Sequence, residues 1–367
     1  MKRRHLLSAA AAAPLAASLP LRAASRPAIR LDLITAWPAA LDNLFGTAQY
    51  FARRLEAVSE GQVQCRVHPA GARVGALEVY DAIASGAYAI GHTAPYYQIG
   101  KSPAHGFFTA LPFGLGLHQQ NAWMRYGNGQ AFWDLLNARD GLVAYPGGNT
   151  GPQTGGWFNR EIERTSDLRG LRMRFPGHGG RVMARTGVTI QQLPAGEVYT
   201  AMSRGLLDAA EWVGPHDDRI LGMHRVSRYL YLPSWAEPSA MLGFYFNRRL
   251  LRELPHFLQA AIPALCCEAD AWMTARYQAL NPPALQALQD DPDVSIRRFP
   301  ESVLDAFADA AATVHAEDSK RSALYREIHA DWQAFGERMD HWDRETRIPY
   351  DRYRLQRAGR LDASDAG

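Results

Sequence analysis

Hydrophobic and polar positions in the first quarter of the chain alternate between strand-like and helix-like patterns. Residues 29–35 (IRLDLIT) alternate apolar and polar positions, as a half-buried strand does. Over 44–58 the apolar residues recur on one helical face, and 62–69 (QVQCRVHP) again has a strand pattern. A short helix is predicted over 76–84 and an apolar strand over 87–94. This succession predicts an α/β fold.

The middle of the chain predicts shorter elements. Residues 103–129 are rich in glycine, proline and aromatic residues, so we expect an irregular but packed segment there. The patterns that follow predict strands at 142–146, 171–175 and 188–193, and helices at 178–186, 197–204 and 217–223.

The last third predicts long helices. Residues 249–280 fit one or two helices, and 301–342 fit another, roughly 60 Å long if continuous at 1.5 Å per residue. Its second half carries apolar residues at alternating spacings of four and three: Ile328, Trp332, Phe335, Met339 and Trp342. Such a narrow seam is typical of helix pairing. Two interpretations remain open, packing onto the chain's own domains and pairing of two protomers.

Length, composition and charge narrow the class of protein. The 367 residues suggest two domains, and a chain that is 47% hydrophobic and 21% charged can bury a large core. Lys and Arg number 40 against 37 Asp and Glu, a net charge of +3 without a basic cluster. This even distribution argues against nucleic acid as a partner.

The N-terminus has the features of a signal peptide. Residues 1–25 combine a basic start, an apolar stretch interrupted by Pro14 and Pro20, and small residues suited to a signal peptidase. Arg3 and Arg4 resemble a twin-arginine signal, although the full consensus is not present. The apolar stretch is shorter than the roughly 20 residues of a membrane-spanning helix. We therefore expect export and cleavage rather than a membrane anchor.

The three cysteines carry little functional signal. A bridge between the adjacent Cys266 and Cys267 would be strained, and the set lacks the paired spacing of a zinc site. Three buried thiols are the simplest interpretation, and pairing of Cys65 with either of the other two stays open.

Familiar enzyme motifs are absent from the sequence. It contains no GxSxG, HExxH, GxxxxGK[ST] or glycine-rich dinucleotide turn. The nearest approach to a metal-binding cluster is His216 beside Asp217 and Asp218. Acidic residues after Pro215 are, however, more typical of the polar first turn of a helix.

Three segments have a composition suited to ligand binding. Residues 147–158 (GGNTGPQTGGWF) combine glycines with two amides, which suits a close backbone approach to a ligand or an ordinary turn. In 168–180 (LRGLRMRFPGHGG), Arg172 and Arg174 share a strand face before a Pro-Gly turn, a position suited to carboxylate recognition or to a surface ion pair. Within 205–238, GLLDAAEWVGP and YLPSWAEP each place a glutamate beside tryptophan and proline, and buried acids are rarely left unpaired.

These segments resemble a known family. ALEVYDAIASGAYAIGHTAPYY, GPQTGGWFNREI, LRMRFPG, LPAGEVYTAMSRGLLDAAEWVGP and WAEP occur in the order found in the extracytoplasmic solute receptors of TRAP transporters, the DctP-like family. EWVGP and WAEP resemble more closely the branch that binds 2-oxo and 2-hydroxy monocarboxylates together with a metal ion. The resemblance covers about residues 29–345. It implies an α/β, two-lobed periplasmic binding protein fold with mixed sheets, hinge segments near 148 and 239, and long C-terminal helices.

The resemblance also implies a division of the chain. We expect a signal peptide (1–25), lobe I (26–148 with about 240–275), lobe II (149–239 with about 276–300), a long C-terminal helix that braces the lobes or pairs two protomers (301–345), and a tail (346–367).

The resemblance assigns roles position by position. The carboxylate-clamping arginine corresponds to Arg174. The metal ligands correspond to Gln153, Glu211, the backbone carbonyl of Trp212, and Glu237; of these, Gln153 and Trp212 are also expected near the substrate. The substrate-facing aromatic hydroxyl corresponds to Tyr97, with Tyr96 as the competing choice, and Asn149 is a weaker candidate. The sequence departs from the family at His216, where an aromatic residue is expected.

Chemistry of the donor atoms supports this assignment. Amide, carboxylate and carbonyl oxygens suit Ca²⁺ or Na⁺ better than zinc or copper. Two glutamates, one arginine and a monoanionic substrate leave two negative charges, which a divalent cation cancels, so the charges favour Ca²⁺.

We therefore expect a periplasmic receptor, not an enzyme, that delivers a pyruvate- or lactate-like acid to TRAP membrane subunits. One alternative is a TRAP receptor for a dicarboxylate or sugar acid without metal, which would need a second cationic group. The other is an exported glycoside hydrolase that uses Glu211 and Glu237 as its acid and base.

Overall fold

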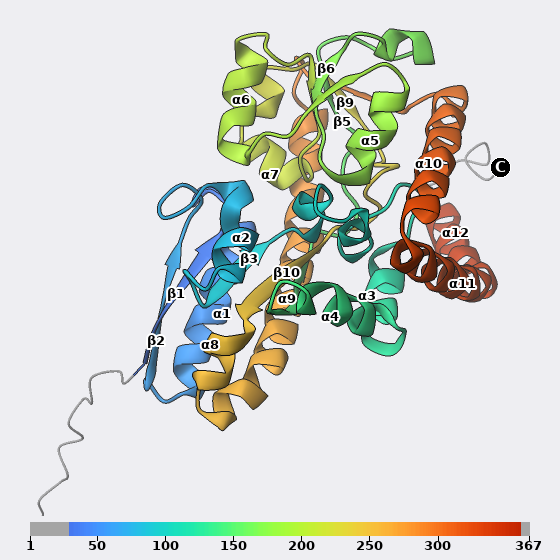
Figure 1. Ribbon diagram of the computed structural model, residues 1–367. Coiled ribbons are helices and arrows are strands. Elements are labelled where there is room, and N and C mark those ends of the chain that lie inside the picture. The colour runs from blue at the N-terminus through green and yellow to red at the C-terminus, as the bar shows by residue number, and fades with distance from the viewer. Residues whose placement is uncertain (1–28, 361–367) are drawn as a thin grey trace, which may run out of the picture.

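Two β-sheets organise the chain in the computed structural model, which describes residues 29–360 (Figure 1). The expected signal peptide lies outside the described residues. The first sheet has the order β2-β1-β3-β10-β4, and the second has the order β11-β9-β5-β8-β6-β7. No helix within residues 29–360 is both long and apolar enough to cross a membrane.

The first sheet is mixed. β1 pairs in parallel with β2 and β3, and β10 runs antiparallel to β3 and β4. Helix α1 packs on it because Ala48, Phe51 and Leu55 form the apolar face that the sequence pattern predicts. The elements of this lobe are β1 (Ile29–Thr35), α1 (Leu44–Val58), β2 (Val63–His68), η1 (Ala76–Glu78), α2 (Val79–Ala84), β3 (Ile90–Thr93), η2 (Pro95–Gln98), η3 (Pro103–Phe108), α3 (Leu117–Tyr126), α4 (Gly129–Ala138), β4 (Leu142–Asn149), β10 (Met241–Asn247) and α8 (Arg248–Glu253).

The second sheet is built from short strands. β6 pairs in parallel with β7 and β8, and β5 runs antiparallel to β8 and β9. Met173, Val182 and Phe307 belong to the core beneath it. Its elements are β5 (Gly156–Phe158), η4 (Thr165–Leu168), β6 (Arg172–Arg174), α5 (Gly177–Arg185), β7 (Thr189–Gln191), α6 (Ala195–Ser203), β8 (Ala209–Ala210), α7 (Pro215–Ile220), η5 (Met223–Arg225), β9 (Tyr229–Tyr231) and β11 (Ser295–Arg297).

The chain passes between the two sheets three times. Residues 150–155 join β4 to β5, and residues 232–240 join β9 to β10. The third crossing is helix α9 (His256–Gln289), which contacts α1 and β4 of the first lobe and α7 of the second. Figure 1 shows α9 running from one lobe to the other.

The C-terminal helices also span both lobes. α10 (Glu301–Arg321) packs on α5, while α11 (Ala323–Glu345) contacts α3 and η3. A single helix over 301–342 is wrong, because Ser322 has an extended backbone and its hydroxyl accepts a hydrogen bond from the N–H of Tyr325. The chain then continues into α12 (Arg347–Arg357).

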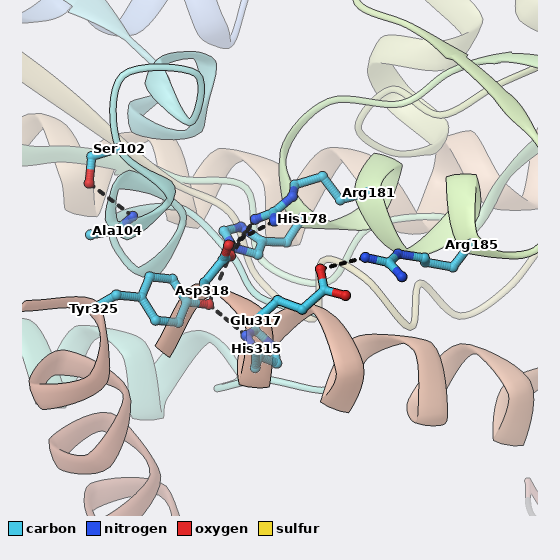
Figure 2. Close-up of polar contacts among 9 residues, drawn as sticks. All are labelled: Ser102, Ala104, His178, Arg181, Arg185, His315, Glu317, Asp318 and Tyr325. Carbon is cyan, nitrogen blue, oxygen red and sulfur yellow. Dashed lines mark hydrogen bonds and ion pairs between the residues drawn. The ribbon is translucent and has the colours of Figure 1, made fainter. Parts of the chain in front are cut away.

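A buried polar network holds α5, α10 and α11 together (Figure 2). Arg181 of α5 donates to Asp318 of α10 at 2.8 Å, and His178 lies 3.5 Å from the same carboxylate. His315 of α10 is hydrogen-bonded to the hydroxyl of Tyr325 in α11 at 2.6 Å. These contacts tie the C-terminal helices to the second lobe.

Part of the predicted helix seam belongs to the protein's own core. Ile328 and Trp332 are buried in the core that includes Phe107 and Trp123. Trp342, at the far end of the seam, is 62% exposed. The interpretation as intramolecular packing therefore holds for the seam as far as Phe335, which packs partly buried against the same core.

Segment 103–129, expected to be irregular, contains η3 and α3 and leads into α4. Trp123 of α3 and Trp133 of α4 stack on Phe108, with ring centroids 5.8 and 5.6 Å apart. Aromatic packing within the lobe thus stabilises helices that are not predicted from the sequence, because the segment is rich in glycine and proline.

The cysteines are all free thiols. Cys65 and Cys266 are buried, whereas Cys267 is exposed, so the expectation of three buried thiols is wrong for Cys267. That side chain lies at the surface of α9, where Arg125 donates to its sulfur at 2.8 Å.

Candidate ligand- and cation-binding site

Arg174 lies at the end of β6 with only 1% of its surface exposed. Its Nη1 donates to the Glu211 carboxylate at 3.0 Å and also to the Glu211 carbonyl. Its Nε donates to the carbonyl of Leu193 at 3.3 Å, and the guanidinium stacks over the Trp212 ring at 4.5 Å. Among the described residues, Nη2 has no hydrogen-bond partner. The protein thus fixes one side of the guanidinium and leaves a donor free.

Glu211 directly follows β8, the strand beside β6. Its N–H donates to the Arg174 carbonyl at 3.0 Å, so backbone pairing places the two side chains next to each other. Burial and the nearby charge of Glu237 raise the pKa of Glu211, and Arg174 opposes that shift. Its Oε1 is buried and finds no donor within residues 29–360.

Glu237 and Gln153 come from the two segments that cross between the lobes. The Gln153 N–H donates to the Glu237 carbonyl at 3.3 Å, which joins the segments, and Gln153 Nε2 donates to the Thr150 hydroxyl at 3.0 Å. Burial raises the pKa of Glu237 to about 8, although Arg174 and the Gln153 side chain lower it. Gln153 Oε1 and Glu237 Oε2 are buried and lack partners in the described chain.

Tyr96 and Tyr97 bring hydroxyl groups from the first lobe, on η2. Burial raises the pKa of Tyr97 to about 12, and the nearby Arg174 charge lowers it. Burial and Glu237 raise the pKa of Tyr96. The pKa values of both hydroxyls are therefore affected by charged residues of the second lobe. The centroids of the two rings lie 5.1 Å apart.

Asn149 ends β4 and is fully buried. Its Oδ1 accepts from the Gly151 N–H at 2.9 Å and its carbonyl accepts from Thr274 of α9 at 3.3 Å. Its hydrogen bonds thus go to its own loop and to α9, not to Arg174 or the glutamates. Its Nδ2 has no acceptor among the described residues.

The glycines beside Asn149 serve packing within the protein. A methyl group at Gly147 would overlap the Phe244 ring, and one at Gly148, where φ is +150°, would overlap the Met273 sulfur. The backbone at these two glycines therefore lies close to the core of the first lobe and to α9, not to a ligand.

The donor set fits a hard cation. Three buried oxygens have no hydrogen-bond partner in the part of the chain that the structure describes: Gln153 Oε1, Glu211 Oε1 and Glu237 Oε2. Burying such atoms costs free energy unless a ligand or ion binds them. Burial raises the pKa values of both glutamates, and the nearby charge of Glu237 raises that of Glu211 further, while Arg174 opposes both shifts. Carboxylate and amide oxygens are the ligands that Ca²⁺ and Na⁺ take.

The side chains of His216, Asp217 and Asp218 each have a different hydrogen-bond partner. Asp218 accepts from Trp157 Nε1 at 2.9 Å, Asp217 accepts from the Tyr277 hydroxyl at 2.6 Å, and His216 contacts Asp42 at 2.8 Å. The three residues therefore do not form one site, and His216 packs against Asp42 rather than against Arg174.

Sequence reasoning missed several supporting groups. Thr150 holds Gln153, and the Ser234 hydroxyl accepts from the Glu237 N–H at 3.0 Å. Both lie in the segments singled out from the sequence, four residues or fewer from the proposed ligands. The Leu193 carbonyl that holds Arg174 has no sequence signal, because any residue carries that group.

The chain matches the family model for bacterial extracellular solute-binding protein, family 7, over residues 35–321. The protein belongs to this solute-binding family. Its members are solute-binding receptors of TRAP transporters, so the prediction of a receptor rather than an enzyme is confirmed. The glycoside hydrolase alternative is wrong.

Three relatives of this solute-binding protein are similar along nearly their whole lengths. The monocarboxylate 2-oxoacid-binding periplasmic protein of Nostoc sp. strain PCC 7120 is 36% identical over 361 residues, which are 96% of this chain and 99% of the relative. A TRAP solute-binding protein from Bordetella bronchiseptica RB50 is a dimer with calcium and picolinate in one site. It is 36% identical with a TM-score of 0.89, and the match covers 92% of this chain and 100% of that chain. A TRAP solute-binding protein from Pseudoalteromonas atlantica T6c, with bound sodium and pyruvate, is 34% identical with a TM-score of 0.85. This match covers 88% of this chain and 98% of that chain. The predicted two-lobed α/β fold is thereby confirmed.

Proposed function

We propose that this receptor binds a 2-oxo or 2-hydroxy monocarboxylate together with Ca²⁺ or Na⁺ and delivers the acid to TRAP membrane subunits. One observation carries the proposal: within residues 29–360, three buried oxygens in the charged cluster of Arg174 and the Nη2 of that arginine have no hydrogen-bond partner. The named ligands of the relatives, picolinate with calcium and pyruvate with sodium, support the same chemistry.

Each residue has a role in this proposal. Arg174 takes one side of the ligand's carboxylate. Gln153, Glu211, Glu237 and the Trp212 carbonyl hold the cation, which would bind the other carboxylate oxygen and the 2-oxo or 2-hydroxy oxygen. Tyr97 offers its hydroxyl to the ligand from the first lobe, and Asn149 is a further candidate donor through its free Nδ2.

A dicarboxylate or sugar acid fits less well. Of the lysines and arginines in residues 29–360, Arg174 alone is fully buried. A second carboxylate would therefore need a cationic group that the buried cluster lacks.

The remaining predictions on organisation form part of the proposal. Residues 1–25 would direct export as a signal peptide that resembles the twin-arginine type. Lobe I would comprise 26–148 with about 240–275, and lobe II 149–239 with about 276–300. The lobes would close over the ligand by bending of the crossing segments near 148 and 239, while 301–345 braces both.

We also propose that the protein forms a homodimer through its C-terminal helices. Trp342 of α11 and Ile348, Tyr350 and Tyr353 of α12 are exposed apolar side chains near the end of the described chain. Clustered exposed apolar groups mark interaction surfaces, and one relative is described as a dimer.

Thermal unfolding of the refolded, ligand-free protein tests the ligand and the cation together. Pyruvate, lactate, succinate and a sugar acid would each be added with Ca²⁺, Na⁺ or a chelator. A ligand at 100 times its Kd stabilises the folded state by about 2.7 kcal/mol. We expect a shift for pyruvate or lactate that disappears with the chelator. If succinate alone raised the melting temperature, and by the same amount with Ca²⁺, Na⁺ or the chelator, the cation site would be rejected.

Substitutions test whether Glu211 belongs to the proposed cation site. Glu211→Gln should abolish the ion-dependent shift because it removes a carboxylate charge next to the cation. Glu197→Gln, at an exposed position of α6, is the matched control and should behave like the wild type. Unchanged binding by the Glu211 variant would remove that residue from the site.

A further inference from the structure

A second cluster of metal-ligating side chains, which does not include Arg174, joins the two lobes. Asp42 comes from the connection between β1 and α1, and His216 and Asp217 come from α7. Ligand atoms of the three residues all lie within 4.8 Å of one another, and His216 Nε2 is 2.8 Å from Asp42 Oδ1. No role in the proposed ligand site requires this cluster.

Helix α9 orients both carboxylates of the cluster. Arg276 Nη2 donates to Asp42 Oδ2 at 2.9 Å, and the Tyr277 hydroxyl donates to Asp217 Oδ2 at 2.6 Å. The second oxygen of Asp42, Oδ1, contacts His216, and the second oxygen of Asp217, Oδ1, has no hydrogen-bond partner among the described residues. Fixed outer partners of this kind are typical of metal ligands.

The backbone supports the histidine in the same way. The His216 N–H donates to the side-chain oxygen of Asn281 in α9 at 3.1 Å, which anchors the first turn of α7. His216 thus reaches Asp42 from a fixed position, with its side chain 18% exposed.

An ion pair between Asp42 and His216 accounts for only two of the three residues. Asp217 is fully buried, and among the described residues its Oδ1 has no hydrogen-bond partner. An unsatisfied buried carboxylate oxygen is costly, so a further positive partner is expected at this point.

We propose that Asp42, His216 and Asp217 form a second cation site, which takes a borderline divalent metal such as Zn²⁺. One imidazole nitrogen and two carboxylate oxygens are a donor set that Zn²⁺ accepts, whereas the oxygen-only set around Glu211 suits Ca²⁺ or Na⁺. Since Asp42 belongs to the first lobe and α7 to the second, the bound metal joins the two lobes.

Zinc titration of the purified, untagged protein tests this site. The protein would first be treated with chelator and then saturated with Ca²⁺ and pyruvate, so that the proposed ligand site does not take up the added metal. We expect one equivalent of Zn²⁺ to bind by calorimetry. His216→Gln and Asp42→Asn should each weaken this binding by at least about tenfold.

Two controls separate this site from other sources of zinc binding. His341→Gln alters an exposed histidine on α11 and should leave the titration unchanged. Glu237→Gln removes an oxygen of the proposed ligand site and should also leave zinc binding intact, so failure of the ligand proposal is distinguishable from failure of this one.

Two outcomes overturn the proposal. The first is a wild-type protein that takes up no Zn²⁺ at micromolar concentration, which would leave a plain Asp42–His216 ion pair. The second is uptake that is equal in the wild type and in the Asp42→Asn variant. Because Asp42 is half-exposed, that substitution tests the site even if the His216 variant fails to fold.

Discussion

Arg174 and Glu211 form an ion pair at 3.0 Å although neither side chain is more than 1% exposed. The pair sits at the ends of the adjacent strands β6 and β8, where the Glu211 N–H donates to the Arg174 carbonyl. Each member keeps one polar atom without a partner in the described chain, Nη2 of Arg174 and Oε1 of Glu211. A buried pair left incomplete in this way is better explained by ligand binding than by stability alone.

Arg174→Lys should weaken ligand binding strongly. Lysine keeps the charge but cannot hold Glu211 and Leu193 while also offering a second nitrogen to a carboxylate. Loss of a buried, hydrogen-bonded charge contact costs about 2–5 kcal/mol, so Kd should rise by at least about thirtyfold in calorimetry. Arg172→Lys is the control on the same strand, because Arg172 is half-exposed and pairs with Asp208. An equal effect of both substitutions would contradict a direct role for Arg174.

The free energy of unfolding should decrease as the pH is lowered below neutrality, because buried histidines resist protonation in the folded state. Burial, together with the nearby charges of His178 and His329, lowers the pKa of His315 to about 3. The unfolded state therefore binds a proton between about pH 6.5 and 3 that the folded state excludes, so stability decreases as pH falls through this window.

The His315 contribution can be isolated by substitution. His315→Phe keeps a ring against His178 and removes the titrating group. From urea unfolding between pH 5 and 6.5, we expect the slope of stability against pH to decrease by up to about 1.4 kcal/mol per pH unit. Equal slopes in the two proteins would show that His315 does not titrate on unfolding.

Gly106→Ala should destabilise the contact between the lobes. Gly106 lies on η3 of the first lobe, and a methyl group there would overlap the His178 ring of the second. Overpacking of this kind costs about 1–3 kcal/mol, which urea unfolding can measure. Gly100→Ala is the control, since nothing lies within 4 Å of the added methyl group. Similar stabilities of the two variants would mean that His178 moves aside without cost.

Trp342→Glu should convert the proposed dimer into a monomer. A charge within an apolar interface must be desolvated, whereas the same charge on a free surface is harmless. Tyr126→Glu, at a side chain that is 92% exposed on α3, provides the control. Light scattering after size exclusion should report a halved mass for the Trp342 variant alone. A dimer that survives the substitution would place the interface elsewhere.

Local patterns predicted those elements whose own residues bury a continuous face. Strand β1 and helix α1 match the predicted ranges 29–35 and 44–58, because their apolar spacing reflects contacts along the element itself. Strands β8 and β9 are two and three residues long, and they exist only because neighbouring strands pair with them. Segments this short carry no periodicity to detect.

The sequence by itself determined the family, the α/β class and the candidate ligand residues, because ordered motifs such as EWVGP and WAEP preserve local chemistry. Only the tertiary structure decided which polar atoms remain without partners and which residues meet across the lobes. Asp42 and His216 are 174 positions apart, and no local pattern predicts their contact. That pairing depends on how the crossing segments and α9 set the two sheets against each other, and such packing becomes defined only when distant parts of the chain bury one another's surfaces.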